Sequence, residues 1–189
     1  MVLIFFNLIP LPWLVLLLFL GMIVSTVVGL FESVVAEIAI VVCFQSLILD
    51  MAGNVGTQSL AVTIRLLVDE NISTKDKFKF ILKELNIGLS NGTILGLLSF
   101  VFIGFYIMFA KNRPFVDAFI LSGCVGVSLF VAMVFSSLVG VVIPMFFHKI
   151  KVDPAVASGP LITTINDLVA VVTYYGLAWL LLIQVFHVH

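Results

Sequence analysis

The segment DMAGNVGTQSL (Asp50–Leu60) carries five polar side chains and two glycines, although the sequence on both sides is strongly apolar. On a helix one stripe along one face is made by Asp50, Asn54, Thr57, Gln58, Ala61 and Arg65. Such a stripe on an apolar helix indicates a membrane helix that lines a water-filled path. The alternative is that Asn54 and Gln58 hydrogen bond to a neighbouring helix and only hold the bundle together.

The composition of the 189-residue chain is that of a membrane protein. Hydrophobic residues make up 62% of it and charged residues 10%, whereas soluble domains are about one quarter charged. The formal net charge of −1 gives no indication of a nucleic-acid partner. We therefore expect an all-α, polytopic membrane protein surrounded by lipid.

Five apolar segments are long enough to cross a hydrocarbon core about 30 Å thick. These expected spans cover about residues 13–31, 33–68, 85–110, 115–147 and 155–186. The second and fourth are too long for a simple crossing, so we expect them to tilt, to project or to break. The candidate break points are Gly53, Gly56, Gly140 and Pro144.

The stretch between the second and third spans has a pattern of its own. Residues 73–84 combine apolar side chains at helical spacing with lysines on another face, which predicts a helix lying on the membrane surface. Within the third span, Gly88, Gly92 and Gly96 recur every four residues. That spacing predicts a helix face that another helix can approach closely.

Basic residues are distributed unevenly over the connections. Seven of the nine lie at the end of the second span or in the connections after the second and fourth spans. Only Lys111 and Arg113 lie on the opposite side. Because positive charge collects in cytoplasmic loops, we expect the N-terminus in the cytoplasm, the C-terminus outside and the protein in the inner (plasma) membrane of the cell.

The fifth span carries a carboxylate deep in the membrane. Asp167 follows Asp153 by about 20 Å along a helix axis, and no lysine or arginine is available at its depth. Thr163 and Ala170 share its helix face, and Gly159-Pro160 is expected to interrupt the helix one turn after its start. Because an unpaired charge in lipid is costly, Asp167 is either protonated or faces water and a cation, and we prefer the cation.

A hydrated divalent ion suits this lining. Mg²⁺ releases its water slowly and is usually held through those waters by one or two carboxylates. In a symmetric dimer, two copies of Asp167 would meet at the two-fold axis and balance the double positive charge.

The sequence resembles the membrane domain of the MgtE family of Mg²⁺ transporters or channels. The resemblance rests on WLVLLLFLG followed by LFE in the first span, GNVGTQS followed by Arg65 in the second, and DPAVASGP with TTINDL in the fifth. It covers nearly the whole chain and implies a homodimer of five-span subunits whose pore lies on the dimer axis between the second and fifth helices.

The resemblance also implies roles for particular residues. Asp167 matches the acid that recognises hydrated Mg²⁺, and Thr163 matches the position whose backbone carbonyl faces the waters of the ion. Asp153 matches an acid at the inner mouth, and Gly159 stands where some members carry Asn. We expect the path to be lined by six further positions, namely Asn54, Gln58, Gly159, Thr164, Asn166 and Ala170.

Three features depart from the family pattern. Family members usually carry a cytosolic part with a superhelical domain and CBS domains, which these 189 residues do not contain, so cytosolic gating is not expected of this chain. Asp50 stands where a small residue is usual, and as a fourth metal-contacting residue it would shift the preference toward Ca²⁺ or Mn²⁺. Ser46 stands where Pro is frequent.

Two other functions stay open on the sequence alone. A Na⁺- or H⁺-coupled secondary cation transporter would use Asp50 and Asp167 as its coupling acids. An intramembrane aspartyl protease would use the same two acids, but TTINDL lacks the Gly-x-Gly-Asp-like context that such enzymes need. We therefore expect no enzyme activity and no cofactor, with Mg²⁺ or another divalent cation as the cargo.

Overall fold

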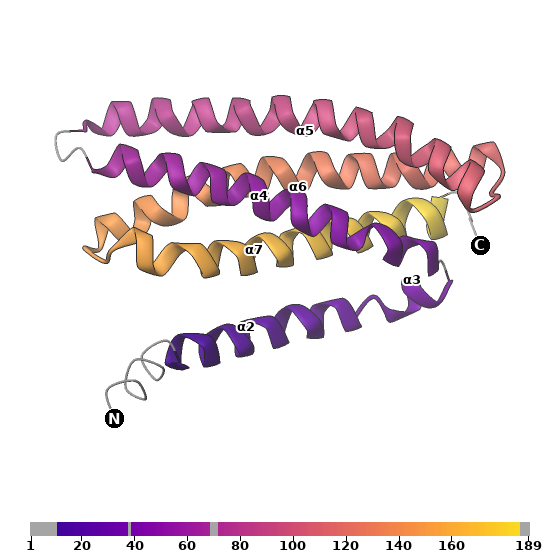
Figure 1. Cartoon of the computed structure of the whole chain (residues 1–189), viewed down its shortest axis with the longest axis horizontal. Helices are drawn as coiled ribbons and strands as arrows, with labels where there is room; N and C mark the ends of the chain where they lie inside the picture. Colours follow the sequence, from indigo (N-terminus) through magenta and orange to yellow (C-terminus); the bar gives the residue numbers. More distant parts are fainter. Residues whose placement is uncertain (1–10, 38, 69–71, 186–189) are drawn as a thin grey trace.

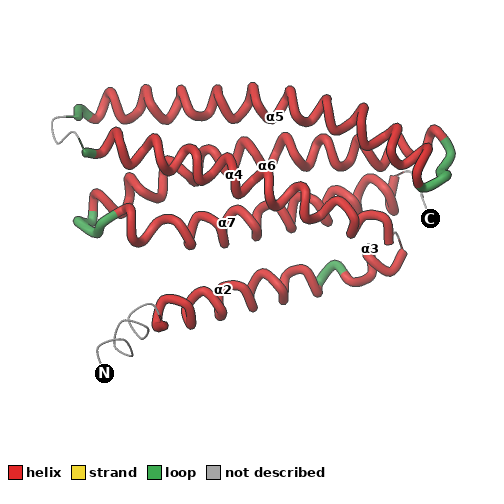
Figure 2. Tube along the Cα trace, viewed as in Figure 1, coloured by secondary structure: helices red, strands yellow, loops and turns green. Residues whose placement is uncertain are grey.

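The protein forms a bundle of long helices, seen in a computed structural model that describes residues 11–37, 39–68 and 72–185. The elements, in chain order, are α2 (Leu11–Gly29), α3 (Glu32–Glu37), the 3₁₀ turn η1 (Ala39–Val41), α4 (Val42–Leu67), α5 (Thr74–Ala110), α6 (Phe115–Lys149), α7 (Pro154–Leu177) and the π-helical end η2 (Ala178–Val185). Helices α4 to α7 run side by side, and α2 follows one side of the bundle and diverges from it toward the N-terminus (Figure 1). The described part of the chain contains helices and short connections and no strand (Figure 2).

Four helical stretches are long and apolar enough to cross a membrane. They are Ala39–Leu67, Thr74–Ala110, Phe115–Lys149 and Gly159–Val185. The first expected span appears as a shorter apolar helix, Leu14–Gly29. The predicted class, an all-α multi-pass membrane protein, is therefore confirmed.

The helices do not break where the sequence suggested. Gly53 and Gly56 lie inside the continuous helix α4, and Gly140 and Pro144 lie inside α6. A glycine costs a helix only about 1 kcal/mol, and at Gly56 and Gly140 the close packing of α4 against α6 offsets that cost. The second apolar segment breaks earlier, before Val42, where the short turn η1 separates α3 from α4.

The expected surface helix over residues 73–84 is also corrected, because these residues are the first turns of the 37-residue helix α5. Ser73 caps that helix, and its hydroxyl oxygen accepts a hydrogen bond from the backbone N–H of Asp76 at 3.2 Å. Glu84 lies where the surface helix was expected to end and the third span to begin. It is buried, and Ser59 Oγ of α4 donates to its carboxylate at 2.9 Å. This contact draws the first turns of α5 into line with the bundle.

Glycines bring α5 and α6 into direct contact, as their spacing predicted. A Cβ placed on Gly96 would lie 2.9 Å from the carbonyl oxygen of Gly126 in α6, and one on Gly92 would lie 3.1 Å from the carbonyl oxygen of Phe130. Gly88, the third glycine of the series, is buried on the same face. The two backbones therefore touch without intervening side chains.

The core lies where α4, α6 and α7 meet. Ile48, Met133 and Tyr174 are among its fully buried side chains. The Tyr174 hydroxyl donates to the carbonyl oxygen of Val41 at 2.7 Å, so the buried phenol is satisfied and the end of α7 is held against the start of α4.

We predict that Gly96→Ala destabilises the protein by about 1–3 kcal/mol, because the new methyl group meets the backbone of α6. Gly53→Ala is the matched control: it is also a Gly→Ala change inside a helix, but nothing lies within 4 Å of the added Cβ. The midpoint of thermal unfolding in detergent measures both. A midpoint that falls equally in the two variants, or in neither, contradicts the packing.

Candidate cation site

A cavity of about 670 Å³ lies between α2, α4 and α7, and Asp167 is in its wall. Helix α2 supplies an apolar side. The other lining residues are Thr57 of α4 and five residues of α7, namely Gly159, Pro160, Thr163, Thr164 and Asp167. The i, i+4 spacing of Thr163 and Asp167 thus places both in one cavity, which Gly159 and Thr164 also line.

The three threonines of the cavity have their hydroxyl protons committed to their own helices. Thr163 donates to the carbonyl oxygen of Gly159 at 3.2 Å, and Thr164 to that of Pro160 at 3.0 Å. Thr57 lies within 3.0 Å of the carbonyl oxygens of Gly53 and Asn54. Because a hydroxyl has one proton and two lone pairs, these oxygens are left as hydrogen-bond acceptors.

Asp167 supplies the only negative charge among the residues that line this cavity. Its side chain is half-buried, and an ion pair with a lysine or arginine is not found within the described residues. A carboxylate and three hydroxyl oxygens, all acceptors, favour a cation or the water molecules around it.

The predicted polar stripe of α4 is divided between two grooves. Thr57 faces the Asp167 cavity, whereas Asn54 and Gln58 line a separate groove of about 430 Å³ together with Asn91 of α5. Within one chain, Asn54 and Gln58 therefore do not share the cavity of Asp167. The cause is geometric: successive residues of a helix point about 100° apart, so Thr57 and Gln58 face different grooves.

Asp50 also lies outside the cavity. It is exposed, and its carboxylate accepts a hydrogen bond from Asn54 Nδ2 at 3.2 Å. Asp50 precedes Gly56 by six residues, or about 9 Å along the axis, and Gly56 packs against Asn166, the neighbour of Asp167. The two acids therefore lie at different depths.

Asn166 and Ala170 were expected to line the path, but the structure buries both. Asn166 is 2% exposed and Ala170 is 0% exposed. Asn166 points at Gly56 of α4 and Ser136 of α6, at a place where Gly56 has no room for a side chain. Neither polar atom of its amide has a hydrogen-bond partner among the described residues. The α7 face that starts at Thr163 turns into the core further along, where Ala170 and Tyr174 are buried and the Tyr174 hydroxyl donates to the carbonyl oxygen of Val41, just before α4.

The start of α7 differs from expectation in one respect. The helix continues through Gly159 and Pro160 without interruption from Pro154 to Leu177. Asp153 is exposed and precedes the helix by one residue, about 21 Å before Asp167 along the axis. It therefore lies apart from the cavity, at the end where α6 turns into α7 (Figure 2).

The wall that sequence reasoning missed comes from α2. Leu17, Gly21 and Val24 face Asp167 across the cavity. They follow each other at helical spacing, but the first span is apolar on every side, so no stripe distinguished the face that meets α7.

The described residues hold no group of three or more His, Cys, Asp or Glu side chains that could bind a bare metal ion. The helical bundle defines a multi-pass membrane protein, and the cavity adds a lining of one carboxylate and three hydroxyl oxygens. The family described as MgtE, a divalent cation transporter, matches residues 45–177, and the chain belongs to that family.

Three relatives support the assignment, each a protein named magnesium transporter MgtE. The chain is 37% identical to that of Bacillus subtilis and 40% identical to that of Enterococcus faecalis, over 168 residues that cover 89% of this chain and 35% of each relative. It is 34% identical to that of Thermus thermophilus over 171 residues, which are 90% of this chain and 36% of that relative. The chain thus spans about a third of the length of these relatives.

We predict that Asp50→Asn leaves the ranking of Mg²⁺ over Ca²⁺ unchanged, because Asp50 is exposed and outside the cavity. Asparagine keeps an oxygen that can accept the bond from Asn54. Isothermal titration of the wild type and the variant with each ion measures the ranking. A reversed ranking would instead place Asp50 in the selectivity site.

Proposed function

We propose that the chain forms the membrane pore of a divalent cation transporter, with Mg²⁺ as its preferred cargo, and that Asp167 recognises the ion through its water shell. The observation that carries the proposal is the lining of the 670 Å³ cavity: one carboxylate and three hydroxyl oxygens whose protons are bonded elsewhere. Family membership supports the same cargo class.

The chemistry of the lining suits a hydrated ion better than a bare one. Water molecules bound to Mg²⁺ direct their protons outward, so a site for the hydrated ion needs acceptors. Thr57, Thr163 and Thr164 meet that need, and the carboxylate of Asp167 adds charge. The cavity is also large compared with one water molecule, which takes up about 30 Å³ in the liquid.

A second copy of the chain completes the proposed path. One Asp167 balances half of the charge of a divalent ion, and a two-fold axis beside the cavity brings a second carboxylate. The exposed polar face of α4, with Asp50, Asn54 and Gln58, is then covered by the partner or by water in place of lipid. We place the protein in the inner membrane with its N-terminus on the cytoplasmic side. Driven by the membrane potential, each divalent ion that moves inward gains about 4.6 kcal/mol per 100 mV, twice the value for a single charge.

We predict that Asp167→Asn abolishes Mg²⁺ uptake into proteoliposomes or removes its selectivity over monovalent ions. The change keeps the shape of the side chain and removes its charge. Asp50→Asn is the matched control, because it also replaces the aspartate of a membrane helix with asparagine, but at a position outside the cavity. Uptake and selectivity at wild-type levels in Asp167→Asn would remove Asp167 from the site.

We predict that Thr163→Val lowers the apparent affinity for Mg²⁺ by about fivefold, the equivalent of one hydrogen bond of about 1 kcal/mol. Thr93→Val is the control: the Thr93 hydroxyl also donates to its own helix, at 2.8 Å from the carbonyl oxygen of Leu89, but it lies on α5. Titration of the uptake rate with Mg²⁺ measures both. An equal effect in the two variants indicates a general effect of losing a hydroxyl and counts against the site.

The same liposomes separate a channel from a Na⁺- or H⁺-coupled transporter. We expect uptake that follows the Mg²⁺ gradient and the membrane potential and is unchanged when the proton and sodium gradients are removed. Uptake that stops without one of those gradients assigns the coupled mechanism.

A further inference from the structure

We infer that the exposed face of α5 binds one anionic phospholipid, with its phosphate at Lys79 and Lys83 and one acyl chain in a groove between α5 and α6. This face, called the α5 stripe below, consists of Lys79, Lys83, Asn86, Ser90, Ile94 and Leu97, all exposed and spaced by three or four residues. Along it the chemistry changes from cationic through neutral polar to apolar. A phospholipid changes in the same order, from phosphate through ester to hydrocarbon.

The charged end of the α5 stripe lies beyond the hydrocarbon core. Helix α5 has 37 residues, so it is about 56 Å long and exceeds the core of about 30 Å. A groove of about 540 Å³ runs along Lys79, Lys83, Asn86 and Ser90. Basic side chains at this level attract anionic headgroups.

The two acids nearest in sequence, Glu84 and Asp76, bond to other residues and do not neutralise the two lysines. Glu84 follows Lys83 directly, but it is buried on the opposite face and accepts a hydrogen bond from Ser59. Asp76 lies one turn further from the membrane and accepts a hydrogen bond from the Ser73 hydroxyl at 2.6 Å. The two lysines therefore face outward as a pair of positive charges.

The neutral part of the α5 stripe lies at the depth of the glycerol esters. Asn86 is about 4.5 Å deeper than Lys83 along the axis, and Ser90 is about 6 Å deeper again. The Asn86 amide and the Ser90 hydroxyl are donors that suit ester carbonyl oxygens. In contact with acyl chains alone, these groups would lose hydrogen bonds.

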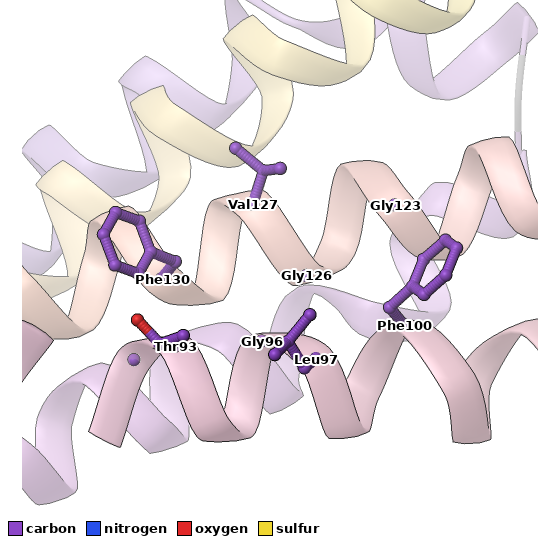
Figure 3. A pocket seen from close by; sticks show the side chains of 9 residues that line it. Thr93, Gly96, Leu97, Phe100, Gly123, Gly126, Val127 and Phe130 are labelled. Carbon is purple, nitrogen blue, oxygen red and sulfur yellow. The ribbon is translucent and has the colours of Figure 1, made fainter. Parts of the chain in front are cut away.

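The apolar end leads into a separate groove of about 340 Å³ between α5 and α6. Figure 3 shows Thr93, Leu97 and Phe100 of α5 on one side of it and Val127 and Phe130 of α6 on the other. Four glycines line it, namely Gly92, Gly96, Gly123 and Gly126, and their missing side chains leave the space open. One leaflet is about 15 Å deep, which is ten residues of helix, so an acyl chain starting at Asn86 reaches Gly96 in this groove.

A second copy of the chain fits the α5 stripe poorly. A two-fold contact places the same patch on both subunits, so Lys79 and Lys83 would meet their own counterparts. Like charges brought together repel each other, whereas a phosphate between them is attracted. The charge therefore favours the lipid as the occupant.

The test is native mass spectrometry of the full chain in micelles that contain phosphatidylglycerol or phosphatidylcholine. We expect the wild type to retain one phosphatidylglycerol, and the double variant Lys79→Gln/Lys83→Gln to bind it at least about tenfold more weakly. Lys149→Gln/Lys151→Gln is the control: it removes two exposed lysines from the same end of the bundle, at the turn from α6 to α7 (Figure 2). Equal retention by the two double variants, or equal retention of both lipids by the wild type, overturns the site.

Two further experiments distinguish a bound phospholipid from a bound phosphate ion. An excess of inorganic phosphate should leave phosphatidylglycerol bound, since the groove contributes through the acyl chain; full displacement by phosphate would show an anion site and overturn the lipid. Val127→Phe fills the groove at an exposed position and should weaken retention of dioleoyl but not of dihexanoyl phosphatidylglycerol. An unchanged preference for the long-chain lipid in that variant also overturns the proposal.

Discussion

The close approach of α4, α6 and α7 at Gly56 fixes the geometry of the cavity that contains Asp167. Gly56 has no room for a side chain because Asn166 of α7 and Ser136 of α6 occupy that space, and a Cβ on Gly140 of α6 would lie 2.5 Å from the Gly56 carbonyl oxygen. Ser136 Oγ also donates to the carbonyl oxygen of Ala52. Thr57 follows Gly56 and Asp167 follows Asn166, so the contact that packs one residue of each helix brings the next residue of each to the cavity.

This arrangement also explains how a carboxylate is kept in a membrane helix. A charge at the centre of a span costs at least about 2.5–3.5 kcal/mol, and Asp167 has no basic partner among the described residues. The cavity surrounds it with hydroxyl oxygens that can accept hydrogen bonds but cannot neutralise it. In the proposed function a hydrated cation would supply both the missing charge and the missing donors, and its binding would offset the cost of burying Asp167.

Sequence reasoning predicted the features that depend on a single helix. The apolar segments identified the membrane class, the glycine spacing identified the face of α5 that meets α6, and the spacing of Thr163 and Asp167 placed them together. It failed where a neighbouring helix decides which part of a face is covered: Thr57 and Gln58 turn to different grooves, and Asn166 and Ala170 face the core. The spacing of residues within one helix carries no information about the angle at which the next helix crosses it. The same limit applies to Gly56 and Gly140, which can mark either a break or a close contact, and here form the contact.

The most direct test of the account is the position of a bound Mn²⁺ ion in an experimental structure, located by anomalous scattering. We expect the ion in the Asp167 cavity about 4 Å from the carboxylate oxygens, since a water molecule bound at about 2.1 Å to the metal separates them by one hydrogen bond. An ion bound directly to Asp167, or one found at Asp50 with the cavity free of metal, would contradict recognition of a hydrated ion by Asp167.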